Sequence, residues 1–106
     1  MNKTDLNEQQ IMQYFDDKFG TDIISRFKKL REEQKELEEA ESLCCGTYND
    51  ETFSNLVDEV SDVLSVIIHA GHCMGYTSEQ LLNMSYEKCK IREIDPGYKH
   101  SNGKKY

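Results

Sequence analysis

The stretch from Asp50 to His72 is the most apolar part of the chain, and it constrains the fold more than any other feature. Leu, Val and Ile residues between positions 56 and 68 cover most of the circumference of a helix, without the two-residue alternation of a strand. A helix this apolar is buried on nearly all sides, so we expect it at the centre of a bundle or at a subunit interface. The longest apolar run within it, Val63 to Ala70, is interrupted by Ser65 and His69 and is far too short to span a bilayer.

Three further segments show helical patterns. Residues 7–18 carry apolar side chains on one side, and Gly20 provides the expected stop. Thr21 is the predicted N-cap of a long helix that runs to about Ser42, and a loop follows over residues 44–50. The capping box at 77–80 opens a last helix that continues through Ile91. No strand pattern occurs, so we predict an all-α fold of four-helix-bundle type with short connections.

The chain length of 106 residues suits one domain, which we assign to residues 1–95, and residues 96–106 read as a polar, flexible and basic tail. Hydrophobic residues make up only 37% of the composition, so one chain buries a modest core. We therefore expect homo-oligomerisation to complete the core.

The charge balance limits the partners. Thirteen Lys and Arg residues stand against twenty Asp and Glu residues, and the net charge of −7 argues against nucleic acid or a membrane surface as a partner. No apolar run follows the N-terminus, so no secretory signal is expected. These features predict a cytoplasmic protein.

Four cysteines occur without the spacing of a secreted disulfide framework, so reduced thiols are expected. A zinc site can be imagined from Cys44, Cys45, His69, His72 and Cys73, because three of these residues cluster between 69 and 73. However, no CxxC pair is present, and 24 positions separate Cys45 from His69. We interpret these residues as ordinary helix or loop residues.

Two acidic motifs indicate a function. Glu33 and Glu36 lie three residues apart on the second predicted helix, and Glu59 and Asp62 have the same spacing on the third, so each pair projects from one helix face. Glu33 lies roughly 80° from the centre of its helix's apolar stripe. When the apolar faces pack, the four carboxylates are drawn toward one seam, where repulsion and lost hydration favour a bound cation. Oxygen ligands suit Mg²⁺, with Mn²⁺ as a substitute, better than zinc.

An alternative interpretation is a solvated helix face. Residues 32–41 hold six acids, and Lys29 and Lys35 can form ion pairs one turn away with Glu33 and Glu39. The second acidic pair argues for a site, because Glu59 and Asp62 lie on the most apolar helix of the chain, where an acid needs something to hold it.

The two motifs, LxEExxEL ending at Leu37 and DExxDVL beginning at Asp58, resemble those of the MazG-like, all-α nucleoside triphosphate pyrophosphohydrolases. The likeness covers about residues 26–92, and 22 residues separate Glu36 from Glu59. The resemblance implies Mg²⁺-dependent cleavage of a nucleoside triphosphate into the monophosphate and pyrophosphate. It also implies a dimer or dimer of dimers, in which helices of two subunits complete four-helix bundles.

Carried over by position, the resemblance makes Glu33, Glu36, Glu59 and Asp62 the Mg²⁺ ligands. Glu36 or Glu32 would act on the attacking water as the catalytic residue, although Glu32 could instead only pair with a basic side chain. Many members of the family continue with a KxxxNxxR stretch that contacts phosphate. Lys88 and Arg92 occupy the corresponding region here, but the Asn is missing.

The C-terminal region supports a phosphate-binding role for Lys88 and Arg92. Residues 87–106 hold six Lys or Arg against three Asp or Glu, whereas the rest of the chain is strongly acidic. Lys88 and Arg92 lie one turn apart on one face, as phosphate contacts would. The alternative is a merely solvating tail.

Several functional alternatives stay open at this stage. The motifs do not read the base, so the substrate could be phosphoribosyl-ATP or a specific pyrimidine deoxynucleotide. A different class is a non-catalytic helical dimer that serves as a structural or regulatory module. His69 lies on the same stripe as Asp62 and could meet a ribose or base, but we expect a helix-surface or interface histidine.

Overall fold

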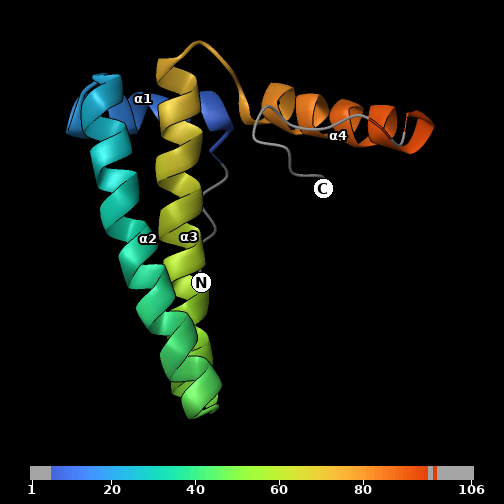
Figure 1. Cartoon of the computed structure of the whole chain (residues 1–106). Coiled ribbons are helices and arrows are strands. Elements are labelled where there is room, and N and C mark those ends of the chain that lie inside the picture. Colours follow the sequence, from blue (N-terminus) through green and yellow to red (C-terminus); the bar gives the residue numbers. More distant parts are fainter. Residues whose placement is uncertain (1–5, 96, 98–106) are drawn as a thin grey trace.

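The computed structural model describes residues 6–95 and residue 97, and no strand occurs among them. The helices are α1 (Glu8–Phe19), α2 (Ile23–Gly46), α3 (Asp50–Cys73) and α4 (Ser78–Ile94) (Figure 1). The all-α prediction is confirmed. The predicted basic tail, apart from residue 97, lies outside the described residues.

Local capping explains where the helices begin and end. Gly20 ends α1 with a φ of 81°, a conformation that favours glycine, and its N–H donates to the carbonyl oxygen of Asp16. The predicted N-cap of α2, Thr21, is wrong by one residue, because the Asp22 carboxylate accepts the N–H of Ser25 at 3.3 Å. The predicted capping box of α4 is confirmed by reciprocal bonds between Thr77 and Gln80.

The C-terminal end of α2 differs from the prediction. The helix continues past Ser42 to Gly46, so most of the predicted loop is helical. Cys44 is buried, and burial of this side chain favours one more helical turn. The loop that remains, residues 47–49, ends at Asn49, which forms a second capping box with Thr52 at the start of α3.

The centre of the fold is the antiparallel pair of α2 and α3, which lie side by side along their length (Figure 1). Side chains spaced alternately three and four residues apart form the inner seam of the pair. On α2 the buried members of this series are Arg26, Leu30, Glu33, Ala40 and Cys44. The corresponding series on α3 comprises Leu56, Glu59, Val63, Val66 and Ala70, all buried or half-buried. Two glutamates therefore occupy positions where a helix pair usually places Leu or Ala.

The other two helices pack at one end of the pair. Helix α1 lies across the end where α2 begins and α3 finishes, and it packs on α3 with Phe15 and Asp16 against His69 (Figure 1). Helix α4 contacts α3 and then extends away from the pair. The carboxylate of Glu8 connects α1 to α4. It accepts one hydrogen bond from the backbone N–H of Ser78, at 2.8 Å, and another from the Ser78 hydroxyl. Within the described residues, the helices of one chain do not close into a four-helix bundle.

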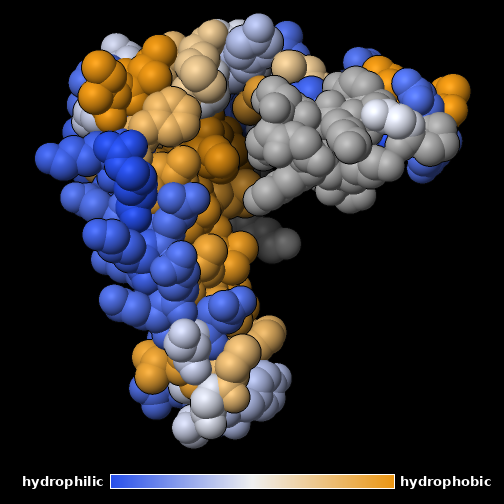
Figure 2. Space-filling view, in the orientation of Figure 1, coloured by the Kyte–Doolittle hydropathy of each residue, from blue (hydrophilic) through white to orange (hydrophobic). Residues whose placement is uncertain are grey.

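Helix α3 keeps an apolar stripe that no other described part of the chain covers. Its members repeat at the same three- and four-residue spacing and are about half exposed: Phe53, Val57, Val60, Leu64 and Ile67. Figure 2 shows this apolar surface running along α3 beside the polar surface of α2. Burial of α3 on nearly all sides is thus not achieved by one chain. No described helix is both long and apolar enough to cross a membrane.

Candidate functional site

The α2–α3 pair brings together the carboxylates of the two acidic motifs. Glu33 from α2 and Glu59 and Asp62 from α3 each offer an oxygen, and these three oxygens lie within 4.8 Å of one another. Glu36, one turn after Glu33, belongs to the same group electrostatically, because its carboxyl interacts with Glu33 and Asp62. The four predicted metal ligands therefore converge from two helices, and we call them the carboxylate cluster.

Glu33 lies deeper than the sequence predicted. Its place at the edge of the apolar stripe suggested a border position, but the residue is only 7% exposed and sits in the seam itself. The buried series of α2 begins at Arg26 and continues through Leu30 to Glu33. A carboxylate at such a position is desolvated on most sides.

Two oxygens of the cluster have no donor. Glu33 Oε2 and Glu59 Oε2 are buried without a hydrogen-bond partner among the described residues. The other Glu33 oxygen, Oε1, lies 3.2 Å from Lys29 Nζ, which compensates part of the charge. An unsatisfied buried carboxylate oxygen is costly, so this arrangement needs a proton or a cation.

Proton affinity in the cluster reflects this crowding. Hydrogen bonding to Glu33, followed by repulsion from its charge, raises the pKa of Glu36 above its ordinary value. Burial, followed by repulsion from the neighbouring carboxylates, raises the pKa of Glu59. Both groups therefore hold protons more tightly than a solvated glutamate does.

Glu32 is not part of the cluster. Its side chain is 58% exposed, and its carboxylate lies 3.9 Å from the Lys29 ammonium group. Of the alternatives for this residue, pairing with a basic side chain matches its position. Lys29 thus contacts both Glu32 and Glu33, and its pair with Glu33 is one that the solvated-face interpretation predicted. Among the described residues, no ion pair of this kind reaches Glu59 or Asp62.

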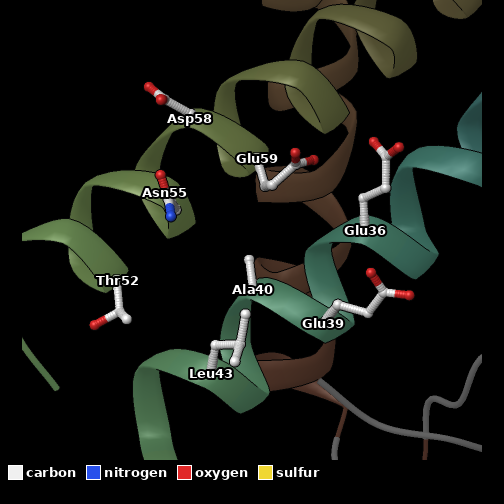
Figure 3. Close-up of a pocket in the computed structure, with 8 residues that line it drawn as sticks. All are labelled: Glu36, Glu39, Ala40, Leu43, Thr52, Asn55, Asp58 and Glu59. Carbon is white, nitrogen blue, oxygen red and sulfur yellow. The ribbon is translucent and has the colours of Figure 1, made fainter. Parts of the chain in front are cut away.

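A hollow of about 360 Å³ opens between α2 and α3 next to the cluster. Figure 3 shows Glu59 extending its carboxylate toward Glu36 at one end, with Thr52 and Asn55 on the α3 side and Leu43 on the α2 side. Thr52 and Asn55 were not predicted as site residues. Asn55 lies one turn and Thr52 two turns before Glu59 on the same helix, and this spacing could have identified them.

Lys88 and Arg92 are not brought to the carboxylate cluster of their own chain. Both lie in the last turns of α4, which packs on α3 but not on α2. The C-terminal end of α4 points away from the α2–α3 pair (Figure 1). Any role for these residues at the cluster would therefore involve the cluster of another chain.

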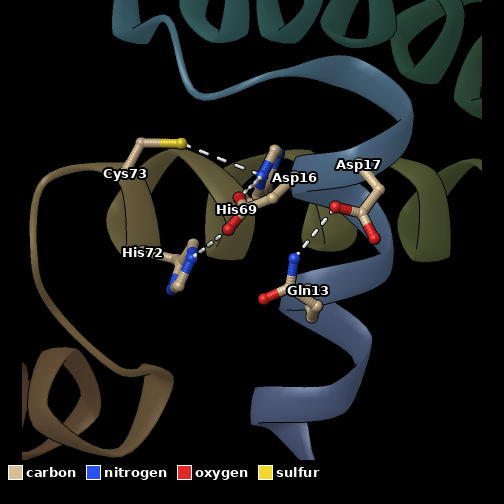
Figure 4. Close-up of polar contacts among 6 residues, drawn as sticks. All are labelled: Gln13, Asp16, Asp17, His69, His72 and Cys73. Carbon is tan, nitrogen blue, oxygen red and sulfur yellow. Dashed lines mark hydrogen bonds and ion pairs between the residues drawn. The ribbon is translucent and has the colours of Figure 1, made fainter.

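A second polar group lies at the junction of α1 and α3, away from the carboxylate cluster (Figure 4). Asp16 from α1 contacts His69 and His72 from α3, with Cys73 beside His69. His69 is only 1% exposed, so the expectation of a surface or interface histidine is wrong. Its burial could not be foreseen without knowing that Asp16 packs against it.

All four cysteines are free thiols. Cys44 and Cys45, in the last turn of α2, belong to neither group of metal-ligating side chains.

Comparison with models of known protein families, with curated proteins and with solved structures finds no match for this chain.

Proposed function

We propose that this protein is a Mg²⁺-dependent nucleoside triphosphate pyrophosphohydrolase similar to the MazG-like enzymes. It would hydrolyse a nucleoside or deoxynucleoside triphosphate between the α and β phosphates, releasing the monophosphate and pyrophosphate. The single observation that carries the proposal is the seam position of Glu33 and Glu59, whose buried oxygens lack donors beside Asp62.

The residues of the cluster fit a hard divalent cation. They are oxygen ligands only, they come from two rigid helices, and their crowding raises the proton affinity of Glu36 and Glu59. A cation would replace those protons and supply the partner that the buried oxygens lack. Glu33, Glu36, Glu59 and Asp62 are the residues that would hold it.

When bound, Mg²⁺ would neutralise the triphosphate charge and stabilise the pyrophosphate leaving group. Glu36 is better placed than Glu32 to accept the proton of the attacking water. Its side chain belongs to the cluster, faces the hollow and has a raised pKa, whereas Glu32 points to Lys29. The hollow between α2 and α3 offers space for part of the substrate next to the carboxylates.

We further propose that a second copy of the chain covers the apolar stripe of α3, giving a dimer or a tetramer. The stripe is continuous along the helix, and its half-exposed members extend from Phe53 to Ile67. Association would bury the helix that one chain leaves open. It would also offer a route for Lys88 and Arg92 to reach phosphate groups, since α4 points away from its own cluster.

The alternative of a non-catalytic helical module explains the apolar stripe but not the cluster. A structural dimer has no use for two glutamates in the inner seam, where apolar residues would stabilise the pair better. We therefore favour the enzyme.

A pyrophosphate-release assay tests the proposal. The purified protein is incubated with a panel of ribo- and deoxynucleoside triphosphates and phosphoribosyl-ATP, with Mg²⁺, with Mn²⁺ and with a chelator. We expect metal-dependent release from at least one substrate, and a loss of about 100-fold or more in Glu36→Gln and Asp62→Asn. The matched control, Glu38→Gln, removes an exposed charge of α2 outside the cluster and should keep full activity. No release from any substrate, or equal release by all variants, would overturn the assignment.

A further inference from the structure

The group at the junction of α1 and α3 has the composition and geometry of a transition-metal site. His69 Nε2 lies 2.9 Å from Asp16 Oδ1 and 3.8 Å from Cys73 Sγ. The oxygen, nitrogen and sulfur atoms of these three residues all lie within 4.8 Å of one another (Figure 4). A tetrahedral zinc ion with bonds of about 2.0–2.3 Å holds its ligand atoms roughly 3.3–3.6 Å apart, so small side-chain shifts suffice.

The fold fixes these side chains in place. His69 and Cys73 are four residues apart on α3 and therefore project from the same face, a spacing that suits two ligands of one ion. The third donor, Asp16, comes from α1, so the ligands belong to two packed helices. The Phe15 ring lies against His69, with 5.6 Å between the ring centres, and helps to shield the histidine from water.

His72 contacts Asp16 on the side away from His69. Its Nε2 lies 3.0 Å from Asp16 Oδ2, the oxygen that does not face His69. A histidine that hydrogen-bonds the second oxygen of a ligating carboxylate fixes the orientation of that carboxylate. A hollow of about 290 Å³ lies beside His72, on the outer side of the group.

Hydrogen bonds within the protein satisfy only part of this group. The Nε2 atom of a neutral His69 can donate its hydrogen to Asp16, but it then has no lone pair for the Cys73 thiol. Zinc at Nε2 would leave the imidazole hydrogen on Nδ1, which is buried without a hydrogen-bond partner among the described residues. An ion at Nε2 would satisfy the nitrogen, the carboxylate and the sulfur together.

The donor set selects the metal. One thiolate, one imidazole and one carboxylate form the mixed set that zinc binds, whereas Mg²⁺ avoids sulfur and prefers oxygen. Asp16 and an ionised Cys73 would balance the two positive charges of the ion. Burial, followed by the negative charge of Asp16, raises the pKa of the Cys73 thiol, so zinc would have to displace the thiol proton.

We propose that Asp16, His69 and Cys73 bind a zinc ion that fastens α1 to α3, and that His72 is the positioning residue of this site. Three protein ligands leave a fourth position for water. The proposed zinc site shares no residue with the carboxylate cluster and would bind a different metal. The zinc proposal can therefore be tested independently of the proposed nucleotide hydrolysis.

Cobalt substitution tests the site in the full chain. The reduced, chelator-treated protein is titrated with Co²⁺, whose four-coordinate thiolate complexes show intense visible bands and a sulfur-to-metal charge-transfer band. We expect one equivalent to produce both features and Zn²⁺ to abolish them by displacement. Cys73→Ser should lose the charge-transfer band, while Cys45→Ser, an exposed thiol on α2, should retain it. A weak octahedral spectrum, or a band lost in Cys45→Ser and kept in Cys73→Ser, would overturn the proposal.

Two further measurements keep the test decisive if a ligand variant fails to fold. His72→Asn leaves the three ligands in place and should weaken Zn²⁺ affinity about 10- to 100-fold, as expected for a residue that orients a ligand. In the unaltered protein, Zn²⁺ should protect Cys73, but not Cys45, from alkylation measured by mass spectrometry. Glu59→Gln in the carboxylate cluster should leave both results unchanged. Equal alkylation of Cys73 with and without Zn²⁺ would contradict the site.

Discussion

Glu33 on α2 and Glu59 on α3 face each other across the inner seam of the helix pair, and each has one buried oxygen for which the described residues provide no hydrogen-bond donor. The seam otherwise holds mainly apolar residues, so the two glutamates weaken the packing that they interrupt. If the proposed cation binds the cluster, this relationship would link it to the stability of the fold.

The first prediction concerns stability without metal. Glu59→Gln removes one of the converging charges while keeping the shape of the side chain, so we expect the melting temperature in chelator to rise by a few degrees. The same variant should lose most of the stabilisation by Mg²⁺ that the unaltered protein shows. Differential scanning fluorimetry measures both effects, with Glu38→Gln as the control. A variant that melts lower in chelator and still responds to Mg²⁺ would contradict this role of Glu59.

The second prediction concerns pH. The pKa values of Glu36 and Glu59 are raised in the folded chain, so the folded state binds more protons than the unfolded state between the ordinary glutamate pKa and the raised values. Without metal, this contribution to stability is present below the ordinary pKa and is lost as the pH rises through the raised values. Mg²⁺ competes with those protons, so its stabilising effect should grow as the pH rises above the ordinary glutamate pKa and through the raised values. A thermal shift by Mg²⁺ that is independent of pH would contradict the cluster as its binding site.

A third prediction concerns the apolar stripe of α3. Leu64→Glu places a charge in the middle of the stripe, where the wild-type side chain is 53% exposed in one chain. We expect the variant to be a folded monomer and the unaltered protein to be a dimer or tetramer, as measured by light scattering after size-exclusion chromatography. Ser42→Glu, on the exposed side of α2, should keep the oligomer. A wild-type protein that stays monomeric at micromolar concentration would show that the stripe has no second copy as its partner.

The fourth prediction concerns the tie between α1 and α4. Hydrogen bonds from the Ser78 side chain and backbone lower the pKa of Glu8, so this carboxylate stabilises the fold above its ordinary pKa. The contribution is lost as the pH falls through the lowered value. Glu8→Gln should reduce the free energy of unfolding at neutral pH by about 1 kcal/mol and flatten its decline in acid. Urea unfolding at several pH values measures this, with the exposed Glu79→Gln as the control. An equal acid dependence in both variants would exclude the role of Glu8.

The helices could be predicted from the sequence because their signals are local. Gly20 and the Thr77 capping box fix the helix ends through contacts within one turn, and the structure shows them as expected. The end of α2 could not be predicted in this way, because burial of Cys44 depends on the packed structure.

For the same reason, only part of the candidate site could be predicted from the sequence. The helical spacing of the two pairs was sufficient to predict that Glu33, Glu59 and Asp62 converge, with Glu36 one turn from Glu33 and interacting with it. The contact between Asp16 and His69 was not predicted, because they are 53 positions apart in the sequence and only the packing of α1 on α3 joins them. The direction of α4, which separates Lys88 and Arg92 from the cluster, also depends on packing rather than on sequence pattern.

The identity of the hydrolysis products tests the proposed pyrophosphohydrolase activity most directly. Nucleoside triphosphates are incubated with the protein and Mg²⁺ in ¹⁸O-labelled water. The products are separated, and their ¹⁸O content is measured by mass spectrometry. The proposed reaction predicts equal amounts of monophosphate and pyrophosphate, with the label in the monophosphate and no turnover by Glu36→Gln. Nucleoside diphosphate with orthophosphate as products, or unchanged turnover by Glu36→Gln, would contradict the account.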